Sequence, residues 1–217
     1  MGIGKWVAAG IGIAAIGSVV ATAQYRAERS EEPSYDVVMA EEGFELRKYA
    51  PMIVAEVTHT GSRRRASGAS FRRLAAYIFA QDRPAGGERI AMTSPVIQER
   101  VDQNERIAMT APVIQEETNE GQWRMRFVMP SRFTMETLPT PPADITLTEV
   151  STRRVAAVRF SGVARSGDWA VMEAMLIEWA EDQDLTVIGC PEYASYDAPM
   201  VPGPLRRNEV LIEVASE

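Results

Sequence analysis

The chain has few of the residues from which most catalytic and metal sites are built. Its 217 residues include one cysteine, Cys190, and one histidine, His59. A single cysteine cannot form an internal disulfide and does not provide a cysteine-based zinc site. A single histidine excludes most metal-hydrolase sites and most Ser-His-Asp triads, because one imidazole would have to serve every role.

Positive charge is also in the minority. The chain has 30 acidic and 23 basic residues, which gives a formal net charge of −7. No overall field therefore favours nucleic acid, and we expect no nucleic-acid partner. Arg63-Arg64-Arg65 and Arg72-Arg73 form a local basic patch, which leaves local phosphate binding open.

Charged residues are absent from residues 6–23, which are rich in Ala, Gly, Ile and Val. This length is close to the ~20 residues that span a bilayer. The run also fits a signal peptide, with Ala21-Thr22-Ala23 as the cleavage site. We expect residues 1–25 to be either a signal peptide or a hydrophobic transmembrane helix, followed by a charged linker over residues 26–34. Both alternatives place residues 35–217 in the periplasm, either tethered to the inner membrane by a single pass or secreted, and a cytoplasmic location is the third option.

A short phrase occurs twice. Residues 88–99 return as residues 105–116, and only Ser94 and Ala111 differ. Ile, Met and Val interrupted by Thr and Pro suit a strand with one irregular position, and residues 100–104 are polar enough for a hairpin loop. Two interpretations remain open: a duplicated β-hairpin, or a pair of methionines, Met92 and Met109, offered to a ligand.

Two further segments have the period of an amphipathic helix. The first follows a loop over residues 61–67, begins at Ser67 or Ser70 and runs to about Ala80. The second runs over residues 168–183, and we expect a short strand over residues 185–188 after it. The apolar stripe of the first consists of Phe71, Leu74, Ala75 and Ile78, and that of the second of Trp169, Met172, Leu176 and Trp179.

Residues 155–162 match residues 54–61 in pattern, and a loop and one of these helices follow each segment. This repeated pattern therefore predicts an α+β fold of two similar βαββ halves. We expect one distorted antiparallel β-barrel with two flanking helices.

Three motifs in this order resemble the SOUL haem-binding proteins. They are residues 35–49, the two Met-Thr-x-Pro-Val phrases, and residues 193–210 with Tyr193, Tyr196 and Arg206-Arg207-Asn208-Glu209. The resemblance covers residues 35–214. It implies a distorted barrel of two similar halves that binds haem or a related tetrapyrrole without a covalent bond, with the first helix packed over the ring.

The resemblance also implies a site. The ring would rest on Phe71, Leu74, Ala75 and Ile78. Gly68 and Ala76 stand where basic residues are expected, so Arg64, Arg65 and Arg72 would hold the propionates in their place. Lys48 stands where one vertebrate member has its proposed iron-ligating histidine.

The iron ligand has several candidates. His59 is the first, because neutral imidazole suits iron. Its counterpart in the second half is Phe160, however, so the position also fits a core or rim site. Met92 and Met109 are the alternatives.

Three functions from different classes follow. The first is a membrane-tethered or periplasmic carrier or buffer of haem or another tetrapyrrole. The second is an enzyme that removes the metal from a tetrapyrrole or modifies its ring, although the sequence shows no clustered acid–base pair and we assign no catalytic residue. The third is an envelope interaction protein with a vestigial pocket.

Overall fold

The computed structural model describes residues 30–101 and 121–216. The N-terminal residues as far as Glu31 form a separate unit from residues 32–217, so residues 32–217 are described by themselves. The expected N-terminal segment and the second copy of the repeated phrase, with Met109, lie outside the described residues. In the described ranges no helix is long and apolar enough to cross a membrane.

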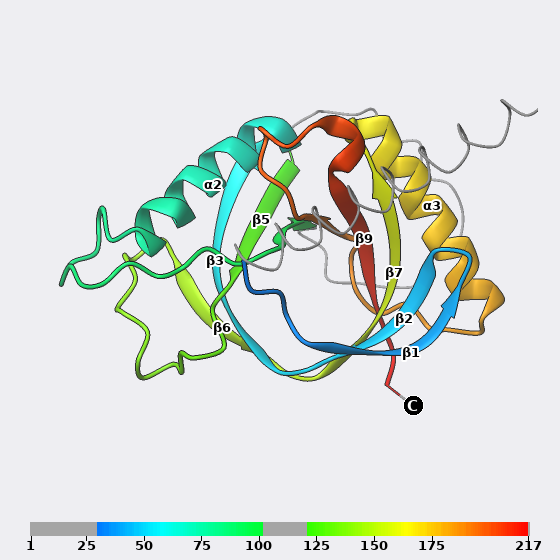
Figure 1. The fold of residues 1–217 in the computed structure, drawn as a ribbon, viewed down its shortest axis with the longest axis horizontal. Coiled ribbons are helices and arrows are strands. Elements are labelled where there is room, and N and C mark those ends of the chain that lie inside the picture. The colour runs from blue at the N-terminus through cyan, green and yellow to red at the C-terminus, as the bar shows by residue number, and fades with distance from the viewer. Residues whose placement is uncertain (1–29, 102–120, 217) are drawn as a thin grey trace, which may run out of the picture. The chain divides into compact units, whose positions relative to one another are not determined.

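The described residues form nine strands and two α-helices in an α+β arrangement (Figure 1). The first part of the chain contains β1 (Tyr35–Glu41), β2 (Phe44–Tyr49), β3 (Met52–Gly61), α2 (Arg63–Ile78), β4 (Val96–Val101) and β5 (Gly121–Val128). The second part contains β6 (Thr146–Val150), β7 (Arg153–Ser161), α3 (Ser166–Asp182), β8 (Glu192–Ser195), the 3-10 helix η1 (Gly203–Leu205) and β9 (Arg207–Val214).

All strand pairs are antiparallel, in the order β1-β2-β7-β9-β8-β4-β5-β3-β6. The predicted repeat is present, since β3-α2-β4-β5 and β7-α3-β8-β9 have the same order of elements. The two halves meet where β4 pairs with β8. Gly61 and Gly162 occupy equivalent positions, with φ of 129° and 121°, which glycine adopts readily before the turn into each helix.

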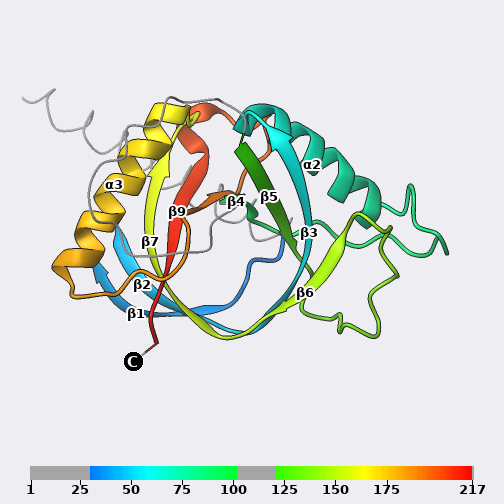
Figure 2. The same ribbon diagram turned by 180° about the vertical axis from the view of Figure 1, so that it is seen from behind.

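The prediction of a barrel was wrong. The sheet is strongly curved, as both views show, but β1 and β6 stand at opposite ends of the strand order and do not pair (Figures 1 and 2). A register shift between Val37 and Met39 interrupts the β1–β2 ladder. Such irregularities bend an edge strand and make it a poor template for further pairing.

Two other expected elements differ from the structure. Helix α2 begins at Arg63, so the three consecutive arginines belong to its first turn and not to a loop. Residues 185–188 were expected to be a strand, but they form only an isolated bridge between Val187 and Val214. Helix α3 was predicted to within two residues, and Asp168 accepts a 2.7 Å hydrogen bond from the backbone N–H of Arg165 at its start.

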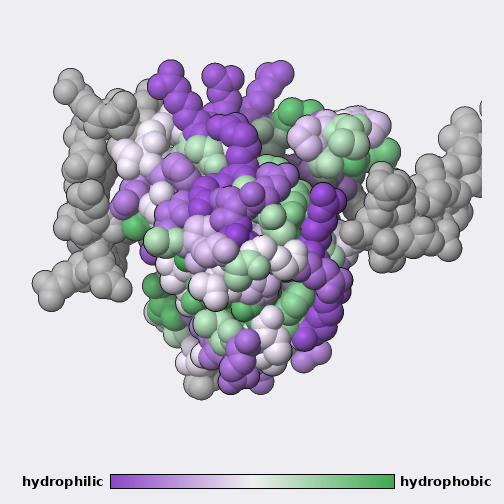
Figure 3. Space-filling model, turned by 90° about the vertical axis from the view of Figure 1, so that its left-hand side faces the viewer, coloured by the Kyte–Doolittle hydropathy of each residue, from purple (hydrophilic) through white to green (hydrophobic). Residues whose placement is uncertain are grey.

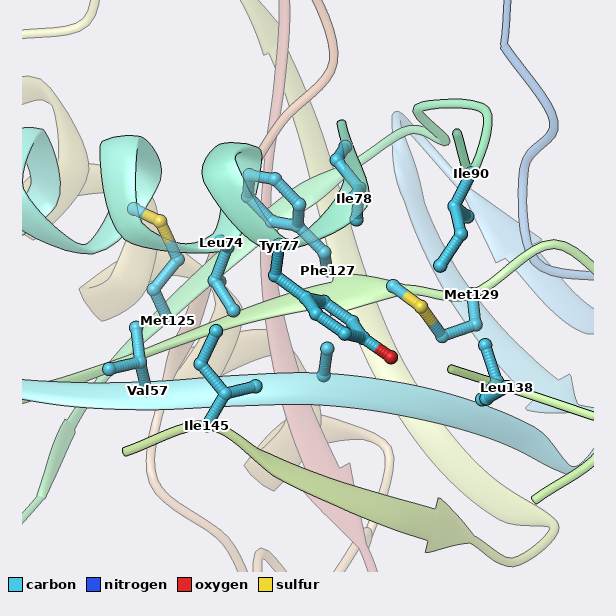
Figure 4. Close-up of a cluster of buried hydrophobic side chains, with 11 residues drawn as sticks. Val57, Leu74, Tyr77, Ile78, Ile90, Met125, Phe127, Met129, Leu138 and Ile145 are labelled. Carbon is cyan, nitrogen blue, oxygen red and sulfur yellow. The ribbon is translucent and has the colours of Figure 1, made fainter. Parts of the chain in front are cut away.

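The helices cover one face of the sheet, each over its own half. Beneath α2 lies a cluster that includes Leu74, Tyr77, Ile78, Met125 and Phe127 (Figure 4). Beneath α3 lies a second cluster. It includes Leu46, Trp169, Leu176, Trp179, Val210 and Ile212.

The opposite face of the sheet has a smaller cluster that includes Tyr49, Val155 and Leu211. All these clusters and all strand pairs lie within residues 32–217. The described residues of this unit therefore contain a hydrophobic core of their own, and we expect residues 30–217 to fold without residues 1–29.

Candidate functional site

The apolar stripe predicted on the first helix is mostly part of the core. Leu74 and Ile78 are 0% and 1% exposed and pack against the sheet beneath α2 (Figure 4). Ala75 is half-buried. Phe71 is 39% exposed and lies edge-on to Phe127, with ring centroids 5.5 Å apart. Of the four predicted ring contacts, Phe71 therefore offers the most surface to a ligand.

The predicted basic residues of α2 are available. Arg64, Arg65 and Arg72 are exposed, and within the described residues none of them has a hydrogen bond or ion pair. Figure 3 views the side of the molecule where α2 and the loop after it lie in Figure 1. Hydrophilic side chains project from the top of this face, and hydrophobic ones form small patches between them. This outer face therefore has cations for carboxylate groups but no broad apolar platform.

His59 is placed beside α2. Its Nδ1 lies 2.9 Å from the hydroxyl of Ser70, which is fully buried. Among the described residues no group of three or more His, Cys, Asp and Glu side chains could hold a metal ion. Because Nδ1 is engaged with Ser70, any iron ligation by His59 would use Nε2. Met92 is half-buried against the core beneath α2.

The residue that sequence reasoning missed is Arg63, the first residue of α2. Its guanidinium carbon lies over three aromatic rings, 3.9 Å from the ring centroid of Tyr193, 4.7 Å from that of Trp169 and 5.8 Å from that of Trp123. Trp123 comes from β5, Tyr193 from β8 and Trp169 from α3. Arg63 and these three rings, which we call the junction cluster, thus connect the two halves of the domain where the first turns of α2 and α3 converge (Figures 1 and 2).

The rings of the junction cluster are fixed by contacts of their own. The hydroxyl of Tyr193 donates a 2.6 Å hydrogen bond to Glu173 Oε2, and burial and this acceptor raise the pKa of Tyr193. Trp169 is edge-on to Tyr193 and to Phe160, at centroid distances of 5.5 and 4.9 Å. The aromatic surface is therefore preorganised and would remain if Arg63 moved.

Arg63 itself has unused hydrogen-bonding capacity. Its Nε donates one long hydrogen bond of 3.4 Å to Gln98 Oε1, and its two terminal nitrogens have no acceptor among the described residues. Burial lowers the pKa of Arg63 to about 10, against the opposing effects of Tyr193 and Glu173. The Arg63 guanidinium thus remains a cation in a partly buried place, and no carboxylate of the described residues is in contact with it.

Four other arginines with mostly buried side chains do have such a partner, since each is paired with one or more glutamates. They are Arg47, Arg126, Arg153 and Arg207. A fifth buried arginine, Arg83, has no carboxylate in contact among the described residues, but its guanidinium donates hydrogen bonds to three backbone carbonyls. Because an unpaired guanidinium in a partly buried place is costly, the exception at Arg63 marks a position where an anionic group from outside would be stabilised.

Knowledge of which strands pair, and in which register, would have revealed part of the junction cluster. Trp123 faces His59 across the β3–β5 ladder, and Tyr193 faces Gln98 across the β4–β8 ladder. The alternation of these strands indicated which side chains share a face. It did not indicate that β4 and β8 are neighbours, and without that pairing the two halves of the cluster stay apart.

Chemically, the junction cluster combines broad aromatic faces with a guanidinium whose terminal N–H groups are unpaired. Aromatic faces bind flat conjugated rings, and a guanidinium binds carboxylates in a bidentate manner. Exposed Arg64 and Arg65 lie in the same turn of α2 as Arg63. The arrangement is suited to a flat, largely apolar molecule with carboxylate groups at its edge.

Comparisons with known proteins agree with this architecture. The family model described as "SOUL heme-binding protein" matches residues 30–213. Among proteins with curated descriptions, none matches the chain.

Solved structures resemble the chain at low sequence identity. The C-terminal domain of EcmrR has 12% identity over 84% of this chain and 99% of that chain, with a TM-score of 0.57. A hydrolase from Listeria innocua has 11% identity over 82% of this chain and 94% of that chain, with a TM-score of 0.53. At these identities the similarity shows a shared fold.

Proposed function

The chain belongs to the SOUL haem-binding protein family, and from that premise we propose that it binds haem or a related tetrapyrrole, non-covalently, at the junction cluster. The observation that supports this position is the Arg63 guanidinium, which lies on three aromatic rings without a carboxylate in contact among the described residues. A tetrapyrrole with propionates supplies both missing parts, a flat apolar ring and carboxylates.

The residues fit such a ligand in three ways. Trp123 and Tyr193 present partly exposed aromatic faces on which a macrocycle can stack. Arg63 can turn its terminal N–H groups to one propionate, and Arg64 or Arg65 can reach a second from the same helical turn. The positive ends of α2 and α3 converge at this place and add to the attraction for anions.

The iron contributes less to this recognition than the ring and the carboxylates. His59 is the candidate ligand, through Nε2, because its Nδ1 is occupied by the Ser70 hydroxyl. This interaction also orients the imidazole. Met92 packs into the core beneath α2, which favours a structural role for this methionine.

A carrier or buffer is the role that these features support. Stacking and ion pairing are reversible. We assign no catalytic residue. We further propose that residues 1–25 tether or export the domain, as their uncharged run suggests.

A haemin titration of residues 30–217, followed in the Soret band, tests the proposal. Arg63→Ala should weaken one-to-one binding by about tenfold to a hundredfold, since a hydrogen bond to a charged group contributes ~1.5–3 kcal/mol. Arg63→Lys should recover part of the loss. Arg132→Ala, in an exposed loop after β5, is the matched control and should not change the affinity. Equal affinities of wild type, Arg63→Ala and Arg132→Ala would refute the proposed site.

A second titration separates the contribution of the flat ring to binding from that of the carboxylates. Protoporphyrin dimethyl ester keeps the flat ring and loses the carboxylate charges. It should bind wild type and Arg63→Ala with the same affinity, because neither complex contains the ion pair. If the ester instead discriminated between the two proteins as strongly as haemin does, Arg63 would act through the ring and not through carboxylates.

A further inference from the structure

Exposed apolar side chains gather beside the junction cluster, in two loops of the second half. Val163, between β7 and α3, is 59% exposed. Met200 and Leu205, between β8 and β9, are 81% and 45% exposed. Apolar side chains with such large exposed fractions on adjacent loops are typical of surfaces that contact a membrane or another apolar surface.

The two loops are held together. The backbone N–H of Gly162 donates a 3.2 Å hydrogen bond to the carbonyl of Arg206. A Cβ placed on Gly203 would lie 2.9 Å from Val163 Cγ2, so the loops are in direct contact. The segment that contains η1 lies at the same end of the domain as the first turns of α2 and α3 (Figures 1 and 2). Val163 and Leu205 therefore lie on loops in contact with each other, and Met200 lies in the same loop as Leu205; we call these three side chains the loop tip.

The cations next to the loop tip are unpaired. Arg64 and Arg65 on α2 and Arg165 at the start of α3 are exposed, and none has an ion pair among the described residues. The nearby carboxylates of Asp168 and Asp197 accept hydrogen bonds from the backbone N–H groups of Arg165 and Arg207. The three arginines outnumber these two carboxylates, so this end of a chain with a net charge of −7 has a local excess of positive charge.

We propose that the loop tip and these three arginines form a docking surface for an anionic lipid bilayer. Apolar side chains inserted at the boundary between headgroups and acyl chains, with arginines beside them at the phosphates, are the general chemistry of interfacial binding. The uncharged run of residues 6–23 ends twelve positions before Tyr35, so an anchored segment would hold the domain close to a bilayer. The surface extends the proposed function, because it would turn the mouth of the tetrapyrrole site toward the phase in which an apolar ring dissolves.

Vesicle co-sedimentation of residues 30–217 tests this surface without the N-terminal run. The domain should partition onto vesicles of phosphatidylglycerol and phosphatidylcholine, and weakly onto phosphatidylcholine alone. Leu205→Asp should reduce binding to the anionic vesicles at least fivefold, and Arg64→Glu should reduce it about fivefold or more, as expected for one basic residue near a charged surface.

Two matched controls lie away from this end. Val38 is 56% exposed on the edge strand β1, so Val38→Asp introduces the same charge at a similar exposure. Arg132→Glu reverses an exposed arginine in the loop after β5. Neither should change the partition. Equal losses in Leu205→Asp and Val38→Asp, or equal binding to both kinds of vesicle, would overturn the inference.

Haemin titration of the same variants keeps this inference distinct from the proposed function. Leu205→Asp should bind haemin like wild type, because Leu205 is not part of the junction cluster. A domain that binds anionic vesicles but no haemin would support the docking surface and remove the tetrapyrrole proposal. A domain that binds haemin but no vesicles would support the tetrapyrrole proposal and remove the docking surface.

Discussion

Arg47 and Glu209 form an ion pair in the interior of the domain. Arg47 Nη1 lies 2.6 Å from Glu209 Oε2, and the two side chains are 1% and 0% exposed. Arg159, Arg207 and Tyr196 also donate hydrogen bonds to this carboxylate, at 3.0, 2.9 and 2.7 Å. The pair joins β2 to β9 across β7. It is a structural centre on the face of the sheet opposite the helices.

The pH dependence of stability follows from this pair. Burial alone would raise the pKa of Glu209, but hydrogen bonds and the charges of Arg47 and Arg207 outweigh it and lower the pKa from 4.5 to about 2. The folded-state pKa lies below the unfolded value, so the stabilisation is complete above pH 4.5 and is lost as the pH falls toward 2. It amounts to roughly 3 kcal/mol.

Urea unfolding between pH 7 and pH 2.5 measures this contribution. Glu209→Gln should be destabilised at pH 7 by ~3–5 kcal/mol, because Arg47 remains buried without its partner. Its stability should then fall less steeply than that of wild type below pH 4.5. Glu149→Gln, an exposed position on β6, should follow the wild-type curve. A Glu209→Gln curve parallel to wild type would show that the carboxylate does not titrate with folding.

The hydroxyl of Tyr196 should contribute to the stability of the folded domain. Tyr196→Phe removes the donor to Glu209 and leaves the ring, over which the Arg207 guanidinium lies at 3.7 Å. We expect a loss of about 1–2 kcal/mol in the free energy of unfolding. Tyr35→Phe is the control, since its ring also lies against an arginine, Arg47, while its hydroxyl has no hydrogen bond among the described residues. Equal losses in both variants would exclude the proposed role of the Tyr196 hydroxyl.

The apolar stripe of α2 should behave as core. Leu74→Ala should lower the free energy of unfolding by ~2–5 kcal/mol, because the side chain is fully buried under the helix. Phe71→Ala should cost less, since 39% of Phe71 is already exposed. Urea unfolding gives both values. A larger loss in Phe71→Ala than in Leu74→Ala would contradict the packing described for α2.

The duplicated phrase should be architectural. Deletion of residues 100–116 joins Glu99 to Glu117 and leaves one copy of the phrase. In the observed register Val101 pairs with Gln122, and Thr118 would take the place of Val101. Asn119-Glu120-Gly121 would then form a three-residue hairpin loop with glycine at its last position, which is a favoured connection.

The shortened chain should fold with at least the stability of wild type, because a shorter loop costs less closure entropy, by ~1–2 kcal/mol. It should also keep its haemin affinity. Urea unfolding and a Soret titration of the deletion variant check both expectations. A folded deletion variant that has lost haemin binding would instead assign the second copy, and with it Met109, to the ligand site.

Much of the architecture could be predicted from periodicity. The similar patterns of residues 54–61 and 155–162 indicated two βαββ halves, and the stripe of Trp169, Leu176 and Trp179 indicated the buried face of α3; the structure confirms both. These features depend on local alternation and on the 3.6-residue period, which one sequence displays directly.

Features that depend on distant pairings could not be predicted in this way. The openness of the sheet depends on the edge strands β1 and β6, and the sequence does not show that they remain apart. The site residue Arg63 was assigned to a loop because Ser67 and Ser70 are favoured N-cap residues as well, whereas helix α2 begins after Ser62. Its three aromatic neighbours come from three different elements, and only the β4–β8 pairing brings two of them together.

The position of the ligand can be measured through the tryptophan indoles. Residues 30–217 contain three tryptophans, Trp123, Trp169 and Trp179. Two belong to the junction cluster, whereas Trp179 stacks on Phe44 about 15 Å further along α3. Paramagnetic ferric haemin should broaden the indole N–H resonances of Trp123 and Trp169 much more than that of Trp179, relative to a zinc porphyrin. Broadening of Trp179 alone, or of no tryptophan under saturating haemin, would contradict a tetrapyrrole site between α2 and α3.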